Sequence, residues 1–436
     1  MPKVAFHTLG CKVNQIETEQ IKEEFIASGY EIVDFNDEAD VYIINTCTVT
    51  HVSDRKSRSI IRRAARKNPS AIVAAIGCTA QVNAKELAAI EGVNLVIGNK
   101  NKENILNIVE DYRRNNTNQV FAEPITKDAK LKPILFTKPH ERTRGFVKIQ
   151  DGCQSFCSYC IVPFARGPVR SKLPQDVLSE VNQLLSLGYK EIVLTGIHTG
   201  FYGTDIGNID LAHLLELILQ KNSEYDFRIR LSSIEPLELN DKIIDLIKDS
   251  SKICRHLHIP LQSGSDKVLK DMNRRYSRKD YEELVLKVAR DIPGVAIAAD
   301  VMVGFPTEED SDFDDTYKLI EDLPLTHLHV FKYSKRPGTK AANIPSVNSE
   351  QEKNQRSEKL LILAEKKHQN FVLANLGQEG NLLVERKISN YSYRGLTDNY
   401  IEVEFGSDRD WVGEFAKVIL DGVDMKTNLV KGTLTS

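Results

Sequence analysis

Three closely spaced cysteines are the residues of this 436-residue sequence whose chemistry is easiest to infer. Cys153, Cys157 and Cys160 have the spacing C-x3-C-x2-C and directly follow the apolar run 145–149. Cysteine thiolates hold iron–sulfur clusters, and a loop this short can place three of them around one cluster. No fourth cysteine follows nearby, so one iron would keep an open position for a substrate or cofactor. Zinc is the alternative, but a structural zinc site normally has four ligands.

Three further cysteines each come just after a segment predicted to be a buried strand. The strands are expected at residues 3–8, 40–45 and 71–76, and the cysteines are Cys11, Cys47 and Cys78. Strands that alternate with helical patterns predict a parallel α/β sheet. The carboxyl ends of parallel strands line one crevice, so the three cysteines are expected to meet there and hold a second cluster. The alternative is three unrelated buried cysteines.

Composition limits the class of protein. The length predicts two or three domains. The net charge of −3 gives no global nucleic-acid signature, so any basic surface must be local. No apolar run approaches membrane-spanning length, so no membrane association is expected. The N-terminus enters a predicted strand at once and lacks the layout of a signal peptide, so a cytoplasmic protein is expected. Seven scattered cysteines do not predict a disulfide framework.

The expected fold class is α/β multidomain, in four segments. Residues 1–118 are predicted to form a Rossmann-like parallel α/β domain, and residues 119–142 a linker. Residues 143–375 carry repeated βα units, which predict a full or partial (β/α) barrel that ends in a helical connector. Residues 376–436 predict a small antiparallel β-barrel of OB-like type. Such barrels often bind RNA, but acidic residues outnumber basic ones here, and its tyrosines fit a barrel core at least as well.

Polar residues and glycines gather at the predicted strand ends of the central segment. Glycine there allows a ligand to approach the backbone closely, and hydroxyl, amide and carboxylate groups can bind amino, carboxylate and ribose groups. A turn glycine or a capping serine is the alternative for each. The candidates are Thr195, Gly196, Ser232, Ser233, Glu235, Gln262, Asp300 and Gly304.

Two dense groups of cations could contact phosphates. The first lies on the helix expected after the second strand, and the other lies in the central segment. A solvated helix face is the alternative reading of such a run. The candidates for phosphate contact are Arg55, Arg58, Arg62, Arg63, Arg66, Arg274 and Arg275.

The C-x3-C-x2-C loop, with Tyr159 before its last cysteine, resembles that of the radical S-adenosylmethionine (radical SAM) enzymes. The resemblance implies that the open iron chelates the amino and carboxylate groups of S-adenosylmethionine, with Tyr159 counted among the cofactor-binding candidates. It also implies a 5′-deoxyadenosyl radical that removes hydrogen from an unactivated carbon. The protein's part is to position and shield that radical.

The order of the three domains, with the last of TRAM type, resembles the methylthiotransferases. Thr8 to Gln15, Asn45-Thr46-Cys47 and Gly77-Cys78 match that family. Within it, Gly10-Cys11-Lys12-Val13-Asn14-Gln15 is most similar to the branch that acts on N6-threonylcarbamoyladenosine beside the tRNA anticodon. The other branches act on isopentenyladenosine in tRNA or on a ribosomal-protein aspartate.

This resemblance implies the cofactors and partners. Two [4Fe-4S] clusters are expected, a radical-generating one on Cys153, Cys157 and Cys160 and an auxiliary, sulfur-delivering one on Cys11, Cys47 and Cys78. S-adenosylmethionine would supply both radical and methyl group, and carbon 2 of the adenine would receive methylthio. The partners would be the tRNA anticodon stem-loop, an electron donor and a sulfur donor. The competing hypothesis is a non-catalytic iron–sulfur protein that binds RNA or transfers electrons; the missing fourth cysteine in each set argues against electron transfer.

Overall fold

The computed structural model describes residues 1–134, 143–207 and 209–435. The chain divides into two compact units. The first contains Met1–Thr137, Gln150–Lys172 and Ser334–Ala342, and the second contains Lys138–Ile149, Leu173–Tyr333 and Asn343–Ser436. Both three-cysteine sets therefore lie in the first unit, although more than 140 residues separate Cys11 from Cys153 in the sequence.

The first unit is built on a six-stranded parallel sheet, as the alternating pattern predicted, in the order β2-β1-β3-β4-β5-β6. The two central strands, β3 and β4, are buried along their whole length, because apolar residues face both sides of a covered parallel sheet. The strands are β1 (Lys3–Thr8), β2 (Glu31–Val33), β3 (Val41–Thr46), β4 (Ile72–Gly77), β5 (Leu95–Ile97) and β6 (Gln119–Phe121).

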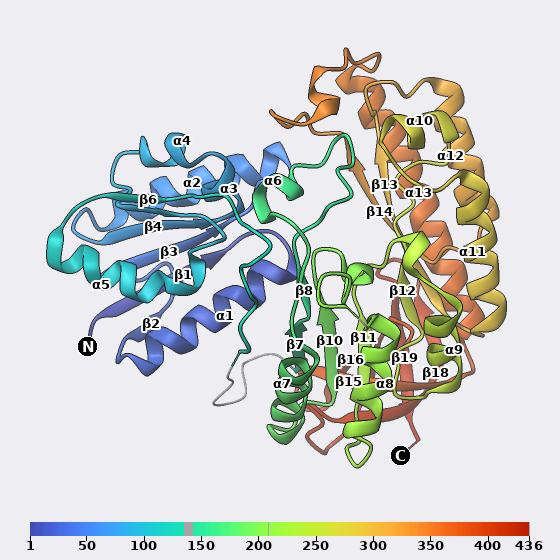
Figure 1. The fold of residues 1–436 in the computed structure, drawn as a ribbon. Helices are drawn as coiled ribbons and strands as arrows, with labels where there is room; N and C mark the ends of the chain where they lie inside the picture. Colours follow the sequence, from blue (N-terminus) through green and yellow to red (C-terminus); the bar gives the residue numbers. More distant parts are fainter. Residues whose placement is uncertain (135–142, 208, 436) are drawn as a thin grey trace. The chain divides into compact units, whose positions relative to one another are not determined.

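Helices cover both faces of this sheet (Figure 1). Phe25 of α1 and Ile105 of α5 pack with β-strand residues on one face. Ile61 of α2 and Leu87 of α4 pack on the other. The helices are α1 (Lys12–Ala27), α2 (His51–Lys67), α3 (Cys78–Val82), α4 (Ala84–Ala88) and α5 (Ile105–Asn115), with the 3-10 turn η1 (Lys102–Asn104).

A short excursion from the central part of the sequence completes the first unit. It contains β8 (Gln150–Asp151) and β9 (Arg170–Ser171), which pair antiparallel, and α6 (Val162–Arg166) between them. The cysteine loop 152–160 therefore begins at the end of β8 and leads into α6.

The segment 119–142, predicted to be a linker, differs from that prediction at its start. β6 pairs in parallel with β5 and adds an edge strand to the sheet. The prolines that follow it suggested a loop, but Val120 and Phe121 have the β-branched and aromatic side chains that favour strands. The end of the segment lies outside the described residues.

The second unit contains six parallel strands in two three-stranded sheets, ordered β7-β10-β11 and β12-β13-β14. A bridge between Ile229 and Ile253 links β11 to the approach to β12. No pairing between β7 and β14 closes the ring among the described residues, so the barrel is partial. The strands are β7 (Arg144–Lys148), β10 (Glu191–Thr195), β11 (Arg228–Leu231), β12 (His256–His258), β13 (Ala296–Val303) and β14 (His327–Lys332).

Helices follow these strands as the βα repeat predicted. They are α7 (Pro174–Ser186), α8 (Leu211–Lys221), α9 (Asp241–Asp249), α10 (Asp266–Asp271), α11 (Arg278–Asp291), α12 (Asp310–Asp322) and the long α13 (Glu350–Asn375). Short 3-10 turns are η2 (Thr199–Phe201), η3 (Pro236–Glu238) and η4 (Lys340–Asn343). Within the described residues, none of the helices combines the length and apolar character needed to cross a membrane.

A closed five-stranded barrel ends the chain, with the strand order β15-β16-β17-β19-β18. Tyr393 and Trp411 lie in its core, together with Val372 from α13. Tyr391 is exposed. Tyr400 stacks on His256 of the central domain, with 4.3 Å between the ring centroids. The barrel strands are β15 (Glu379–Lys387), β16 (Ser392–Thr397), β17 (Glu402–Gly406), β18 (Phe415–Asp424) and β19 (Leu429–Leu434).

Candidate functional site

Cys11, Cys47 and Cys78 lie at the carboxyl ends of three adjacent strands. β1 pairs with β3, and β3 pairs with β4, all in parallel. Cys47 directly follows β3, Cys78 directly follows β4, and Cys11 is the residue before α1. The sheet topology brings together residues that sequence spacing would not pair.

The turn that carries Cys11 is fixed against Cys47. Gly10 has a φ of +96°, and a Cβ built there would lie 2.9 Å from the Cys47 sulfur. A side chain at this position would both strain the backbone and displace the cysteine. Asn14 donates from Nδ2 to the carbonyls of Leu9 and Thr46, at 2.8 and 3.0 Å. This one amide therefore ties the Cys11 turn to the end of β3.

The thiols of this set influence one another. Burial raises the pKa of Cys47 to about 11, and the nearby Cys78 and Cys11 contribute to the same rise. Positive charge would stabilise three thiolates in this place, and an iron core would supply such charge. Among the described residues no three Cys, His, Asp or Glu side chains are arranged around a single metal ion. A cubane differs in that each thiolate binds a separate iron, so the donor set fits a cluster better than one ion.

The loop with the other cysteines is held by backbone contacts. Gly152 has a φ of +78°, and a Cβ there would lie 1.9 Å from the Pro168 carbonyl oxygen, so only glycine fits. The Cys153 amide donates to the Gly167 carbonyl at 3.0 Å, and the Cys160 amide to the Cys157 carbonyl at 2.9 Å. All three cysteines are half-buried, which leaves the sulfurs accessible to a metal.

Buried hydroxyls beside both cysteine sets have no hydrogen-bond partner among the described residues. They are Thr79 Oγ1, next to Cys78, and Ser158 Oγ, next to Cys157. A buried donor left unpaired costs about 1–3 kcal/mol, so such groups in a folded protein point to a missing acceptor. Cluster sulfides and thiolates are acceptors of this kind, and hydrogen bonds to them tune cluster potential. The residues present therefore fit an iron–sulfur cluster at each set.

Several residues of this region were not singled out in the sequence. Asn99 donates from Nδ2 to the Cys78 sulfur at 3.5 Å and to the Ala165 carbonyl at 2.8 Å. Arg166 donates to Asn14 and to two carboxylates. Its place six residues after Cys160 and 15 residues after its partner Asp151 was the available signal, since its partners Asn14 and Glu17 lie far away in the sequence.

The cofactor candidates of the second unit sit at its strand ends, with one exception. Asp300 lies inside β13 rather than in the loop beyond it, and its Oδ1 accepts a hydrogen bond from His258 Nε2 at 3.0 Å. Glu235 is paired with Arg274, and burial raises the pKa of the Glu235 carboxyl. Ser232 Oγ and Gln262 Oε1 are buried and lack a partner among the described residues. The other candidates are Thr195, which ends β10, Gly196, Ser233, whose carbonyl accepts from Thr199, and Gly304, which follows β13.

Two of the seven candidate phosphate-binding arginines form ion pairs with carboxylates. Arg274 is 5% exposed and holds Glu235. Arg58 donates to Asp54 at 3.2 Å and to Glu86 at 2.6 Å. An arginine that is already paired must lose its carboxylate partner before it can bind a phosphate, so Arg58 and Arg274 are the weaker candidates. The candidates that remain exposed are Arg55, Arg62, Arg63, Arg66 and Arg275.

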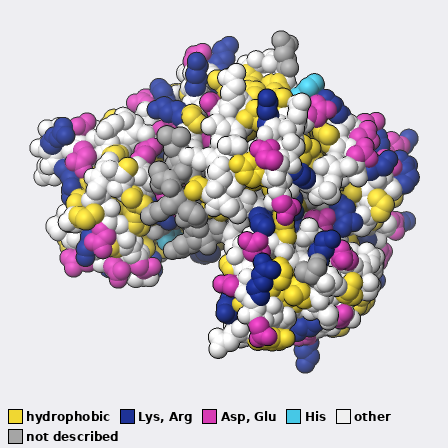
Figure 2. Space-filling model, turned by 90° about the horizontal axis from the view of Figure 1, so that it is seen from below, with side chains coloured by type: hydrophobic (Ala, Val, Ile, Leu, Met, Phe, Trp, Pro, Cys, Tyr) yellow, Lys and Arg dark blue, Asp and Glu magenta, His cyan; other side chains and the backbone are white. Residues whose placement is uncertain are grey.

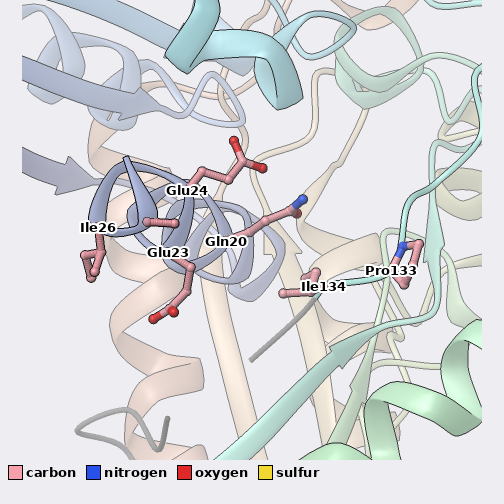
Figure 3. A pocket seen from close by; sticks show the side chains of 7 residues that line it. Gln20, Glu23, Glu24, Ile26, Pro133 and Ile134 are labelled. Carbon is pink, nitrogen blue, oxygen red and sulfur yellow. The ribbon is translucent and has the colours of Figure 1, made fainter. Parts of the chain in front are cut away.

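Cys254 is buried in the second unit, and burial raises the pKa of its thiol to about 12. A neutral, fully enclosed thiol is a packing residue. A cavity of about 450 Å³ lies elsewhere, against the C-terminal half of α1 (Figure 3). Glu23 and Glu24 line it. Both glutamates lie about 18–20 Å along the helix axis from Cys11, so this acidic cavity is neither the cysteine site nor a phosphate site.

Comparison with known proteins identifies the family. A model described as "Uncharacterized protein family UPF0004" matches residues 3–98, and one for the radical SAM superfamily matches residues 147–320. Threonylcarbamoyladenosine tRNA methylthiotransferase MtaB of Bacillus subtilis is 42% identical, over 96% of this chain and 93% of the relative. The Aquifex aeolicus protein of the same name is 41% identical, over 96% of this chain and 100% of the relative. The chain belongs to the radical SAM methylthiotransferase family.

A relative with another substrate in its name is less similar to this methylthiotransferase. The tRNA-2-methylthio-N(6)-dimethylallyladenosine synthase of Clostridium botulinum is 33% identical, over 94% of this chain and 92% of the relative. Among solved structures, the radical S-adenosylmethionine methyltransferase TsrM of Kitasatospora setae covers 78% of this chain and 74% of its own. Its TM-score is 0.59 at 15% identity, which shows a common fold.

Proposed function

We propose that this methylthiotransferase adds a methylthio group to carbon 2 of N6-threonylcarbamoyladenosine beside the anticodon of tRNA. The observation that carries the proposal is the presence of two separate three-cysteine sets in one compact unit. The motif Gly10 to Gln15 and the 42% identity to a threonylcarbamoyladenosine-specific relative support the choice of substrate over dimethylallyladenosine.

Each cysteine set has its own role in the proposal. A [4Fe-4S] cluster on Cys153, Cys157 and Cys160, with S-adenosylmethionine, would supply the radical, and one on Cys11, Cys47 and Cys78 would supply the sulfur. An adenine C–H bond has no leaving group for polar substitution, which is why the reaction needs both. An electron donor and a sulfur donor are further partners that this chemistry requires.

The chain's own residues hold these sites in place. Asn14 joins the Cys11 turn to the end of β3, and Asn99 donates to the Cys78 sulfur. A hydrogen bond to a thiolate lowers its basicity and stabilises it as a ligand. Gly152 allows the second loop to turn immediately after β8. These contacts bind and orient the thiolates before any substrate arrives.

A local basic surface is proposed to attract the tRNA. Figure 2 shows basic and acidic side chains intermixed on the face that it displays, in keeping with the net charge of −3. α2 begins four residues after Cys47 and exposes Arg55, Arg62, Arg63 and Arg66. Lysine and arginine contacts to phosphates provide the salt-dependent part of RNA affinity.

The test is mass spectrometry of tRNA nucleosides from cells that lack the gene. The methylthio form of N6-threonylcarbamoyladenosine should disappear and its precursor should accumulate, and the wild-type gene should restore it. Loss of the methylthio form of dimethylallyladenosine instead would assign the enzyme to the other tRNA branch.

A further inference from the structure

Arg166, at the end of α6, is 1% exposed and is one of the most deeply buried large side chains of the described residues. Its Nη1 donates to Glu17 at 3.0 Å and to both oxygens of Asp151 at 3.0 and 3.1 Å. Its Nη2 donates to Asn14 at 2.5 Å and to Glu17 at 3.2 Å. Charge-assisted, bidentate contacts of this kind are the strongest that arginine makes.

These partners lead directly to both cysteine sets. Asn14 holds the Cys11 turn and the end of β3, as described above. Asp151 accepts from the Gly152 amide at 2.8 Å, immediately before Cys153. The residue beside Arg166, Ala165, accepts from the same Asn99 amide that donates to the Cys78 sulfur. One guanidinium group therefore joins the base of the first cysteine set to the start of the second.

Cations outnumber carboxylates in the ion pairs around Arg166 that the described part of the chain forms. Glu17 also accepts from Lys102 at 2.6 Å, and Asp151 lies 3.5 Å from Arg170. In these pairs the buried cations Arg166, Lys102 and Arg170 share the carboxylates of Glu17 and Asp151. An unpaired buried charge is costly, so the excess cation needs a further negative partner. Burial works against the charge of Arg166, but Asp151 and Glu17, followed by Cys78 and Cys11, hold the pKa of its guanidinium well above the usual value.

Thiolates at Cys11, Cys47 and Cys78 would supply a further negative charge when they hold a cluster. Three thiolates around a [4Fe-4S] core leave the assembly with a net negative charge of about one, and net charge and hydrogen bonding set its potential. The surplus positive charge around Arg166 would therefore lie near the surplus negative charge of a cluster at the first cysteine set.

We propose that Arg166 is a positioning residue that places and electrostatically balances the Cys11–Cys47–Cys78 site and fixes the Cys153–Cys160 loop beside it. The inference rests on the proposed function, because it needs a cluster at the first cysteine set. It adds a residue that sets the potential of this cluster without binding iron. A buried cation favours the more negative, reduced state, so its loss makes the reduction potential more negative.

The experiment measures potential rather than activity. The full-length chain with Cys153→Ala, Cys157→Ala and Cys160→Ala is reconstituted anaerobically, its iron is counted, and the remaining cluster is titrated with dithionite and followed by EPR. Arg166→Met should shift the potential to a more negative value by at least 59 mV, a tenfold change for one electron. Glu17→Gln should shift it to a more positive value. Arg166→Lys, which keeps the charge, should show less than half the shift of Arg166→Met.

A matched control separates charge from damage. Arg356 is a similarly buried arginine of the second unit, bonded to Glu308 and Asn348 at 2.6 Å each. Arg356→Met should leave the potential unchanged. Shifts of the same sign in Arg166→Met and Glu17→Gln, or an equal shift in Arg356→Met, would overturn the proposal.

Misfolding of Arg166→Met and loss of iron from the starting protein would have different consequences. If Arg166→Met does not fold, the sign of the Glu17→Gln shift decides, since a zero or negative shift contradicts the electrostatic role. If the starting protein retains no iron, the assignment of Cys11, Cys47 and Cys78 under the proposed function fails, whatever Arg166 does.

Discussion

Glu191 accepts hydrogen bonds from Arg230 at 2.7 and 3.1 Å, although neither side chain is more than 1% exposed. Arg228 donates to the same carboxylate at 2.6 Å. Both arginines also donate to backbone carbonyls of the terminal barrel, including Thr397 and Leu396 at 3.0 and 2.8 Å. The ion cluster at the carboxylate of Glu191 thus joins the central strands to the barrel.

Removing one partner of this cluster should be strongly destabilising. We expect Arg230→Met to lower the free energy of unfolding by about 3–5 kcal/mol, because it removes one of the two arginines that donate hydrogen bonds to the fully buried carboxylate of Glu191. Denaturant unfolding followed by circular dichroism measures this. Arg386→Met removes an exposed pair with Glu402 and should cost less than about 1 kcal/mol. Equal losses in the two variants would show that burial does not set the cost.

The free energy of unfolding should decrease as the pH is lowered, because the protein contains a buried histidine. Burial, followed by the charges of His368 and His329, lowers the pKa of His327 to about 3. The folded protein therefore holds it neutral, while the unfolded chain takes up a proton below about pH 6.5. The contribution of the neutral His327 to the free energy of unfolding is complete above pH 6.5 and is lost as the pH falls toward 3. The loss amounts to about 2 kcal/mol between pH 7.5 and 5.

The variant His327→Gln should flatten this slope in unfolding experiments across that range. Some slope should remain, since burial also lowers the pKa of His368. The comparison is His213→Gln, which replaces a histidine whose side chain is 55% exposed, so its effect on the slope should be smaller than that of His327→Gln. An unchanged slope in His327→Gln would contradict a neutral buried imidazole.

The periodic patterns of the sequence predicted the sheet, the partial barrel and the terminal barrel, because each depends on local residue choice. The positions of Cys11, Cys47 and Cys78 followed from one topological rule applied to three strand ends. Arg166 could not be found in this way, because its partners Asn14 and Glu17 lie about 150 residues earlier and no local pattern links them. The pairing of Arg274 with Glu235 could not be foreseen for the same reason, since 39 residues separate the two in the sequence.

The two cysteine sets should have separable roles. A variant with Cys11→Ala, Cys47→Ala and Cys78→Ala should keep about half of the roughly eight irons of two cubanes. It should still cleave S-adenosylmethionine under dithionite, but form no methylthio product, because nothing delivers sulfur. Iron analysis and mass spectrometry of the tRNA product measure both. Cys254→Ala, at a buried thiol outside both sets, should retain all iron. Wild-type product yield in the triple variant would rule out sulfur delivery from this site.

The exposed arginines of α2 should carry part of the tRNA affinity. Arg62 and Arg63 are adjacent and exposed, and the buried residues Ile61 and Ala64 that flank them anchor the helix to the sheet. Replacing both by Glu reverses the charge. It also removes the contact of the Arg63 guanidinium over the Phe35 ring, 5.2 Å from the ring centroid, so unfolding of the variant is checked as well. We expect Arg62→Glu with Arg63→Glu to weaken tRNA binding and to reduce the slope of log affinity against log salt by about 1–2, since each phosphate contact contributes about 0.9 or less. Filter binding at several salt concentrations measures this, while iron content and S-adenosylmethionine cleavage should stay normal. The matched control is Arg113→Glu with Arg114→Glu on α5, which covers the other face of the sheet. If both pairs weaken binding equally, the attraction is a general effect of net charge, and α2 is an ordinary solvated helix face.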